Sequence, residues 1–189
     1  MPKPLTDQIY QLLLEEGLQP DYLPAIPVAD TPTESEASTA NPLQPHEPIH
    51  TLRLPVRGKH AEWMCLVRIF EQTERVLVYS ILPAHVPTER RHDVALMLTQ
   101  INYGLILGNF ELDLQDGEVR YKTSLDIEAI SLNATVLRNL LYGNFFSLDM
   151  YYHALIQAIE TDHPIEQLIY QAEHPNEMTG FDLVDDIVH

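Results

Sequence analysis

The pair Asp116-Gly117 lies between two runs of alternating apolar and polar residues, and it constrains the fold more than any other feature. Asp-Gly in this setting predicts a hairpin, because a type I′ turn needs positive φ at both central residues. A two-residue loop predicts three pairs on one face: Leu114 with Val119, Leu112 with Tyr121, and Phe110 with Thr123. It predicts two pairs of opposite charge on the other face: Asp113 with Arg120, and Glu111 with Lys122. The sequence therefore predicts a hairpin with one charged, solvent-ready face.

A second hairpin is predicted from strands over 62–71 and 75–82, joined near Gln72-Thr73, and both of its faces are apolar. With a two-residue loop, one face carries Trp63, Cys65, Val67, Ile69, Val76, Val78 and Leu82. The other face carries Met64, Leu66, Phe70, Leu77, Tyr79 and Ile81, with Arg68 and Arg75 among them. An odd loop length would shift this pairing. Two apolar faces imply two covers: helices of the chain can cover one, and the second needs the N-terminal helix, the tail or another protein.

Residues 52–57 also alternate, but Pro55 within the run indicates an edge strand. Apolar residues at helical spacing predict a helix over 5–16, which Gly17 ends, and a second helix over 88–103. The residues from 20 to 48 show no period and contain seven prolines, which is typical of a linker or of a loop draped over the surface.

The C-terminal helical region begins at Asn133. Gly143-Asn144 indicates a helix end, Ser147 indicates the N-cap of the next helix, and a short helix over 164–173 follows. These elements predict an α+β fold: a five-stranded antiparallel sheet with helices in the order α-βββ-α-ββ-α(α). The expected divisions are an N-terminal helix (1–18), a Pro-rich linker or loop insertion (19–49), the α+β domain (50–173) and an acidic C-terminal tail (174–189).

The net charge of −17 argues against nucleic acids and anionic membranes as partners, because both attract Lys and Arg. No N-terminal segment resembles a signal peptide, and no apolar run is long enough to span a membrane. The single cysteine, Cys65, excludes an internal disulfide framework and suits a reducing compartment. We therefore expect a soluble, cytoplasmic protein.

The basic residues concentrate in the first strands: Arg53, Arg57, Lys59, Arg68 and Arg75. They are interpreted either as exposed charges that protect a sheet edge or as a surface complementary to the acidic region after Arg138, within a dimer or across domains.

Nine histidines raise the possibility of a metal site. Glu89 with His92, and Glu160 with His163, have the E-x-x-H spacing of di-iron proteins, but those sites require facing helices of a bundle. Asp149 and His153 lie one helical turn apart, a spacing that is common by chance. The chain has no Gly-rich phosphate loop and no G-x-S-x-G or H-E-x-x-H motif. We expect no catalytic residues, no metal and no cofactor.

The elements around the first hairpin resemble those of the YbjN family of bacterial sensory transduction regulators. The resemblance rests on Asn102-Tyr103, on Gly108-Asn109-Phe110-Glu111-Leu112-Asp113 and on Asp116-Gly117-Glu118-Val119. It extends over about residues 52–172, including the strands from Trp63 to Leu82 and Ser147-Leu148-Asp149. It implies a fold similar to type III secretion chaperones, which are acidic homodimers that bind extended client segments. It implies no catalytic residues.

The sequence thus favours a non-enzymatic, chaperone-like or regulatory module that binds a protein partner, and we expect a homodimer. The expected partner or dimer contacts are Met64, Leu66, Phe70, Leu77, Tyr79 and Ile81. The alternative is a metal- or small-molecule-dependent enzyme that uses histidine and carboxylate residues.

Overall fold

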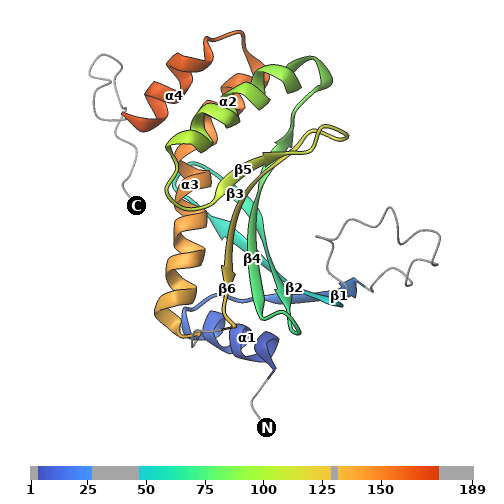
Figure 1. Ribbon diagram of the computed structural model, residues 1–189. Helices are drawn as coiled ribbons and strands as arrows, with labels where there is room; N and C mark the ends of the chain where they lie inside the picture. The colour runs from blue at the N-terminus through green and yellow to red at the C-terminus, as the bar shows by residue number, and fades with distance from the viewer. Residues whose placement is uncertain (1–3, 27–46, 129–131, 175–189) are drawn as a thin grey trace, which may run out of the picture.

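The structure is a computed structural model that describes residues 4–26, 47–128 and 132–174. One antiparallel sheet has the strand order β1-β2-β3-β4-β6-β5. Figure 1 shows the long helix α3 running along this sheet, α1 at one end, and α2 and α4 together at the other. The bounds are α1 Leu5–Glu15, β1 Asp21–Ile26, β2 Ile49–Arg57, β3 Glu62–Phe70, β4 Arg75–His85, a 3₁₀ turn Thr88–Arg90, α2 Arg91–Gly104, β5 Asn109–Leu112, β6 Glu118–Asp126, α3 Ala134–Glu160 and α4 Ile165–Glu173.

The α+β class is confirmed, but the sheet has six strands rather than the predicted five. The additional strand, β1, lies in the Pro-rich stretch and pairs with β2 from Asp21↔Arg53 to Ile26↔Ile49. Its sequence shows no alternation, and Pro24 removes a backbone donor, so its extended form depends on the neighbouring strand. The rest of the predicted linker, residues 27–46, lies outside the described residues.

The β3–β4 hairpin has the register that a two-residue loop predicts. Leu66 pairs with Tyr79 and Phe70 with Arg75. Glu74 in the turn has a φ of 47°. The buried carboxylate of Glu47 accepts hydrogen bonds from the backbone N–H groups of Gln72 (2.5 Å) and Thr73 (3.1 Å), and so it fixes this turn from outside the hairpin.

The predicted register of the β5–β6 hairpin is wrong by two residues. Phe110 pairs with Tyr121 and Leu112 with Val119, which leaves a four-residue loop, 114–117. Among the described residues of this loop, only Gly117 has positive φ (85°), so a type I′ turn does not form. The carboxylates of Asp113 and Asp116 instead accept from backbone N–H groups two residues ahead. A shift of two keeps every side chain on its predicted face.

The C-terminal helices were predicted with one break too many. Helix α3 continues through Gly143-Asn144, and the Ser147 hydroxyl donates to the Gly143 carbonyl (2.8 Å) instead of capping a new helix. The predicted start is confirmed, since the Asn133 side chain accepts from Val136 N–H. Buried Asn144 explains the continuity: its amide nitrogen donates to the carbonyls of Val78 (3.0 Å) and Tyr121 (3.1 Å), which holds this turn of α3 against the sheet.

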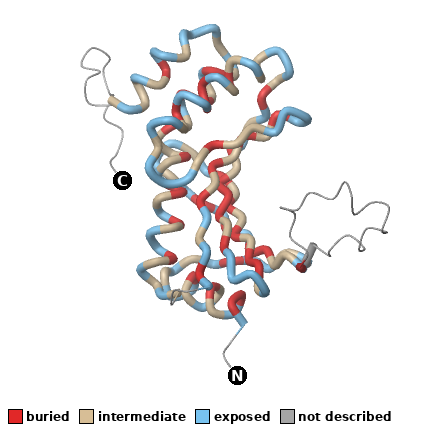
Figure 2. Tube along the Cα trace, viewed as in Figure 1, coloured by how far each residue is buried: buried red, intermediate tan, exposed pale blue. Residues whose placement is uncertain are grey.

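The core lies between the helices and one face of the sheet, where buried residues concentrate along the central strands (Figure 2). This face includes Trp63, Cys65, Val67, Val78 and Tyr121. The side chains that alternate with them point to the opposite face of the sheet.

Candidate binding surface

The second face of the sheet, called the open face below, has no described helix packed on it, because α1 and α3 lie on the core side. Strands β3 and β4 place four partly exposed apolar residues there: Met64, Leu66, Leu77 and Ile81. Met64 lies opposite Ile81, Leu66 opposite Tyr79, and Leu77 opposite Arg68. Tyr79 itself is buried. Five of the six predicted contact residues therefore form one continuous patch.

The sixth residue, Phe70, lies at the end of β3 opposite Arg75 and is buried. It extends the patch toward the β3–β4 turn but offers little surface of its own.

Tyr79 is buried because two cations flank its ring. The guanidinium of Arg120 lies 4.4 Å from the ring centroid and that of Arg68 lies 5.2 Å from it. Such cation–π contacts hold long side chains over an aromatic ring. The patch is therefore a mixed surface in which apolar side chains and guanidinium groups are packed together.

The open face carries six of the eleven Lys and Arg residues of the chain: Arg53, Arg57, Arg68, Arg75, Arg120 and Lys122. Five of them have acidic neighbours. Arg53 binds Asp21 (2.9 Å), Arg57 binds Glu62 (2.5 Å), Arg75 binds Asp126 (3.2 Å), and both Arg120 (2.8 Å) and Lys122 bind Glu111. Arg68 has no ion pair among the described residues.

Glu111 is an example of the ion pairs at the rim of the open face, the border of charged residues around the apolar patch. Burial tends to raise the pKa of its carboxyl, but hydrogen bonds from Lys122 and Arg120 lower that pKa below its ordinary value. Both of these cations come from β6. The sequence alone did not predict that these cations lie beside the apolar patch. Strand β6 pairs with β4 in the sheet, although β5 and a helix separate the two strands in the chain.

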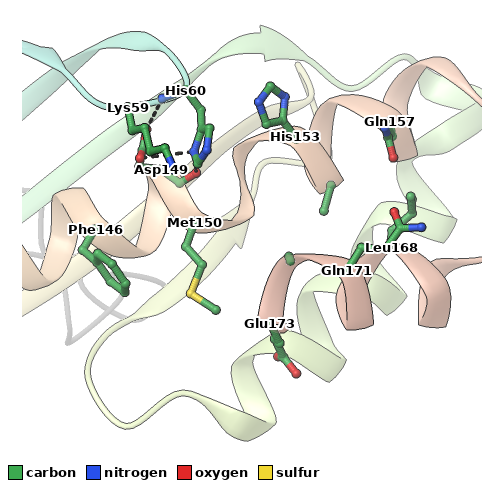
Figure 3. A pocket seen from close by; sticks show the side chains of 12 residues that line it. Lys59, His60, Phe146, Asp149, Met150, His153, Gln157, Leu168, Gln171 and Glu173 are labelled. Atoms are coloured by element: carbon green, nitrogen blue, oxygen red, sulfur yellow. Dashed lines mark hydrogen bonds and ion pairs between the residues drawn. The ribbon is translucent and has the colours of Figure 1, made fainter. Parts of the chain in front are cut away.

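A second feature is a cleft of about 600 Å³ between the β2–β3 turn, α3 and α4 (Figure 3). Phe146 and Met150 line it from α3, Leu168 and Glu173 from α4, and Lys59 from the turn. The Phe146 side chain is 70% exposed. The lining combines apolar side chains with polar and charged ones, a composition found in both binding sites and reaction sites.

Asp149 joins the turn to α3 beside this cleft. Its Oδ1 accepts from the backbone N–H of His60 (2.9 Å), and its backbone carbonyl lies 3.1 Å from His60 Nδ1. The His60 ring is 4.9 Å from that of His153. Burial, and then the neighbouring His60, lower the pKa of His153 below its usual value, which favours the neutral form of this ring. The spacing of Asp149 and His153 in the sequence did not predict that His60 lies beside them, because His60 comes from the β2–β3 turn, far away in the chain.

The metal alternative requires a cluster of ligating side chains. In residues 4–26, 47–128 and 132–174, no three His, Cys, Asp or Glu side chains are arranged to hold a metal ion. The four residues with E-x-x-H spacing, Glu89, His92, Glu160 and His163, are all exposed.

None of the helices in the described part of the chain is long and apolar enough to cross a membrane.

Comparison with known proteins finds similar solved structures and one matching family. The crystal structure of YbjN from E. coli, described as "a putative transcription regulator", is 14% identical and has a TM-score of 0.44 over 91% of this chain and 94% of that chain. No curated protein matches. The model of the family described as "Putative bacterial sensory transduction regulator" matches residues 43–157. This match covers more than half of the sequence, so the chain belongs to the YbjN family.

Proposed function

We propose that this chain is a non-enzymatic regulatory module that binds a protein partner through the open face of its sheet, and that it acts in the cytoplasm. The observation that carries the proposal is the apolar patch of Met64, Leu66, Leu77, Tyr79 and Ile81, which no described helix covers. An apolar patch on a sheet face favours association with another protein surface. Membership of a family described as a regulator agrees with this role.

The partner is a second copy of the chain, a client segment, or each in turn. A chaperone-like role, which the resemblance of the sequence implies, requires that the patch accept an extended segment. A homodimer requires that two such patches, or one patch and another surface, bury each other.

Photo-crosslinking in cells distinguishes these partners. We would place a benzophenone amino acid at Leu77, on the open face, and as a control at Leu114, which is 65% exposed in the β5–β6 loop. The expected result is a covalent adduct from position 77 that Ile81→Glu abolishes, with a self-adduct marking a dimer. Equal adducts from both positions, or none from position 77, would refute the proposed surface.

Purified protein provides the companion measurement. Light scattering of the wild-type chain gives its mass in solution, and Leu66→Glu should shift any dimer toward monomer while Leu114→Glu leaves it unchanged. Far-UV circular dichroism of each variant verifies that its fold is intact.

The second candidate is a small-molecule or metal-dependent enzyme that uses the cleft, because His60, Asp149 and His153 meet there. Asp149 is engaged by the backbone of His60, and the other carboxylate of the cleft, Glu173, accepts a hydrogen bond from the Tyr151 hydroxyl. Elemental analysis of protein purified without chelators tests this candidate. Stoichiometric zinc or iron that is lost on His153→Ala would favour the enzyme.

A further inference from the structure

Arg68 lies in the middle of the open face, with Thr51 of β2 as its cross-strand neighbour on one side and Leu77 of β4 on the other. Two side-chain atoms of this cross-strand pair are unusual. Arg68 Nε and Thr51 Oγ1 are both shielded from solvent, and neither has a hydrogen-bond partner in the described part of the chain. A shielded polar group without a partner costs free energy, so such groups are rare in folded proteins.

One kind of partner, an acceptor, can satisfy both of these groups. A guanidinium Nε–H can only donate a hydrogen bond, and a threonine hydroxyl can donate one as well. Arg68 as a whole is partly exposed, so a ligand on the open face can reach part of its side chain. The missing element is therefore an acceptor, and a carboxylate matches the planar fork of a guanidinium.

The chain itself does not supply this acceptor among the described residues. The acidic side chains at the rim of the open face, Glu111, Asp126 and Glu62, bind other cations. The residues around Arg68 are apolar or aromatic: Leu66, Leu77 and Tyr79. Within residues 4–26, 47–128 and 132–174, Arg68 thus has no acidic partner, and it lies inside an apolar patch.

We infer that the partner of the open face is a peptide segment with a carboxylate, from Asp or Glu, flanked by apolar residues, and that Arg68 and Thr51 bind this carboxylate. The inference rests on the proposed function, which requires only that the patch bind protein. It adds the negative charge and the apolar neighbours that the bound segment must have. Apolar side chains of the segment contact Met64, Leu66 and Leu77, while its carboxylate supplies the counter-charge at the centre.

A random twelve-residue peptide library displayed on phage tests the inference without knowledge of the natural partner. We would select on the wild-type chain and keep the clones that Leu66→Glu no longer binds. The expected pool is enriched in Asp and Glu between apolar residues. One selected peptide and its Asp→Asn analogue, or Glu→Gln analogue, are then synthesised.

Calorimetric titration of both peptides against four proteins completes a double-mutant cycle and its controls. On the wild-type chain, we expect the amide analogue to bind roughly tenfold more weakly, the effect of a charged hydrogen bond. On Arg68→Gln, the two peptides should bind alike. On Arg75→Gln, a matched control on the same face that already pairs with Asp126, the tenfold difference should persist. Thr51→Val should reduce the difference, and it covers the case in which Arg68→Gln does not fold.

The results of the selection and the titration distinguish failure of the inference from failure of the proposed function. Clones that depend on the open face but lack acidic enrichment, or an amide effect that persists on Arg68→Gln, overturn the inference and leave the proposed function standing. A library that yields no clone dependent on Leu66 overturns the inference, and the proposed function falls with it only if position 77 also gives no crosslinked adduct.

Discussion

Gly58 lies where the β2–β3 turn meets α3, and the absence of a side chain is required there. A Cβ atom at this position would lie 2.5 Å from the Trp63 ring and closer still to Asp149 Oδ1. Both neighbours are held in place, Trp63 by a hydrogen bond to Ser80 and Asp149 by His60. We therefore expect Gly58→Ala to lower the free energy of unfolding by about 1–3 kcal/mol, as measured by urea denaturation.

Gly143→Ala is the matched control. Gly143 lies in the interior of α3, and a Cβ atom there would meet nothing within 4 Å. Alanine favours a helix interior over glycine, so this variant should gain about 0.5–1 kcal/mol. A loss of stability in Gly143→Ala, or no loss in Gly58→Ala, would contradict the close contacts at Gly58 and the open space at Gly143.

Single residues also show what a sequence can and cannot predict about the site. The alternation in β3 and β4 predicted which side chains share the face that holds Leu66 and Tyr79, because period two is a local property. It did not predict that Arg120 would lie over Tyr79, because that contact depends on the pairing of β4 with β6.

At the scale of elements, α1 is capped by a residue far away in the chain. The carboxylate of Glu71 accepts from the backbone N–H groups of Leu5 (2.9 Å) and Thr6 (2.7 Å), and also from the Thr6 hydroxyl. These are unpaired donors of the first helical turn, where a negative charge is also favourable. The cap ties α1 to the β3–β4 turn.

The cap predicts a pH-dependent stability. Burial tends to raise the pKa of Glu71, but the hydrogen bonds from Thr6 and Leu5 lower it below the ordinary value of 4.5. Its stabilising effect is therefore present above pH 4.5 and is lost as the pH falls through the lowered pKa. Glu71→Gln should cost about 0.5–2 kcal/mol at pH 7, and the difference from wild type should shrink in acid. Urea denaturation at several pH values measures it.

Glu15→Gln, at the exposed end of the same helix, controls for the loss of one negative charge. A Glu71→Gln difference that is constant with pH, or a Glu15→Gln difference of the same size, would show that Glu71 does not act as an ionised cap.

Elements with strong local patterns were predictable, such as α2 and the β3–β4 hairpin. The errors arose where long-range contacts override local signals. Asp116-Gly117 favours a type I′ turn, but Asx hydrogen bonds stabilise a longer loop. Gly143-Asn144 is typical of a helix end, but the contacts of Asn144 with the sheet keep α3 continuous.

At the scale of the whole molecule, Cys65 reports on global unfolding. This only cysteine of the chain is fully buried in β3, and burial raises the pKa of its thiol. A thiol attacks disulfide reagents as its thiolate, so native protein should be unreactive toward Ellman's reagent at pH 8. Reactivity should increase with urea in parallel with the loss of helical circular dichroism. Rapid stoichiometric labelling of native protein would show instead that β3 opens locally.

The strand order was the part of the molecule that sequence could not predict. Neighbours in the chain form hairpins, whereas the pairing of β4 with β6 and the addition of β1 both depend on where the whole sheet buries its apolar side chains. The open face is a product of this order, since β6 brings its cations beside the apolar strands.

The two edges of the sheet have a consequence for how copies of this protein can assemble. One edge is β1, whose pairing is irregular around Pro24, and the other is β5, which has only four residues. Short strands and proline make poor templates for strand addition. Copies of the chain are therefore not expected to polymerise into a continuous sheet or seed fibres, even at high concentration. Any association between copies is expected to use side-chain surfaces, where it can be saturated and reversed.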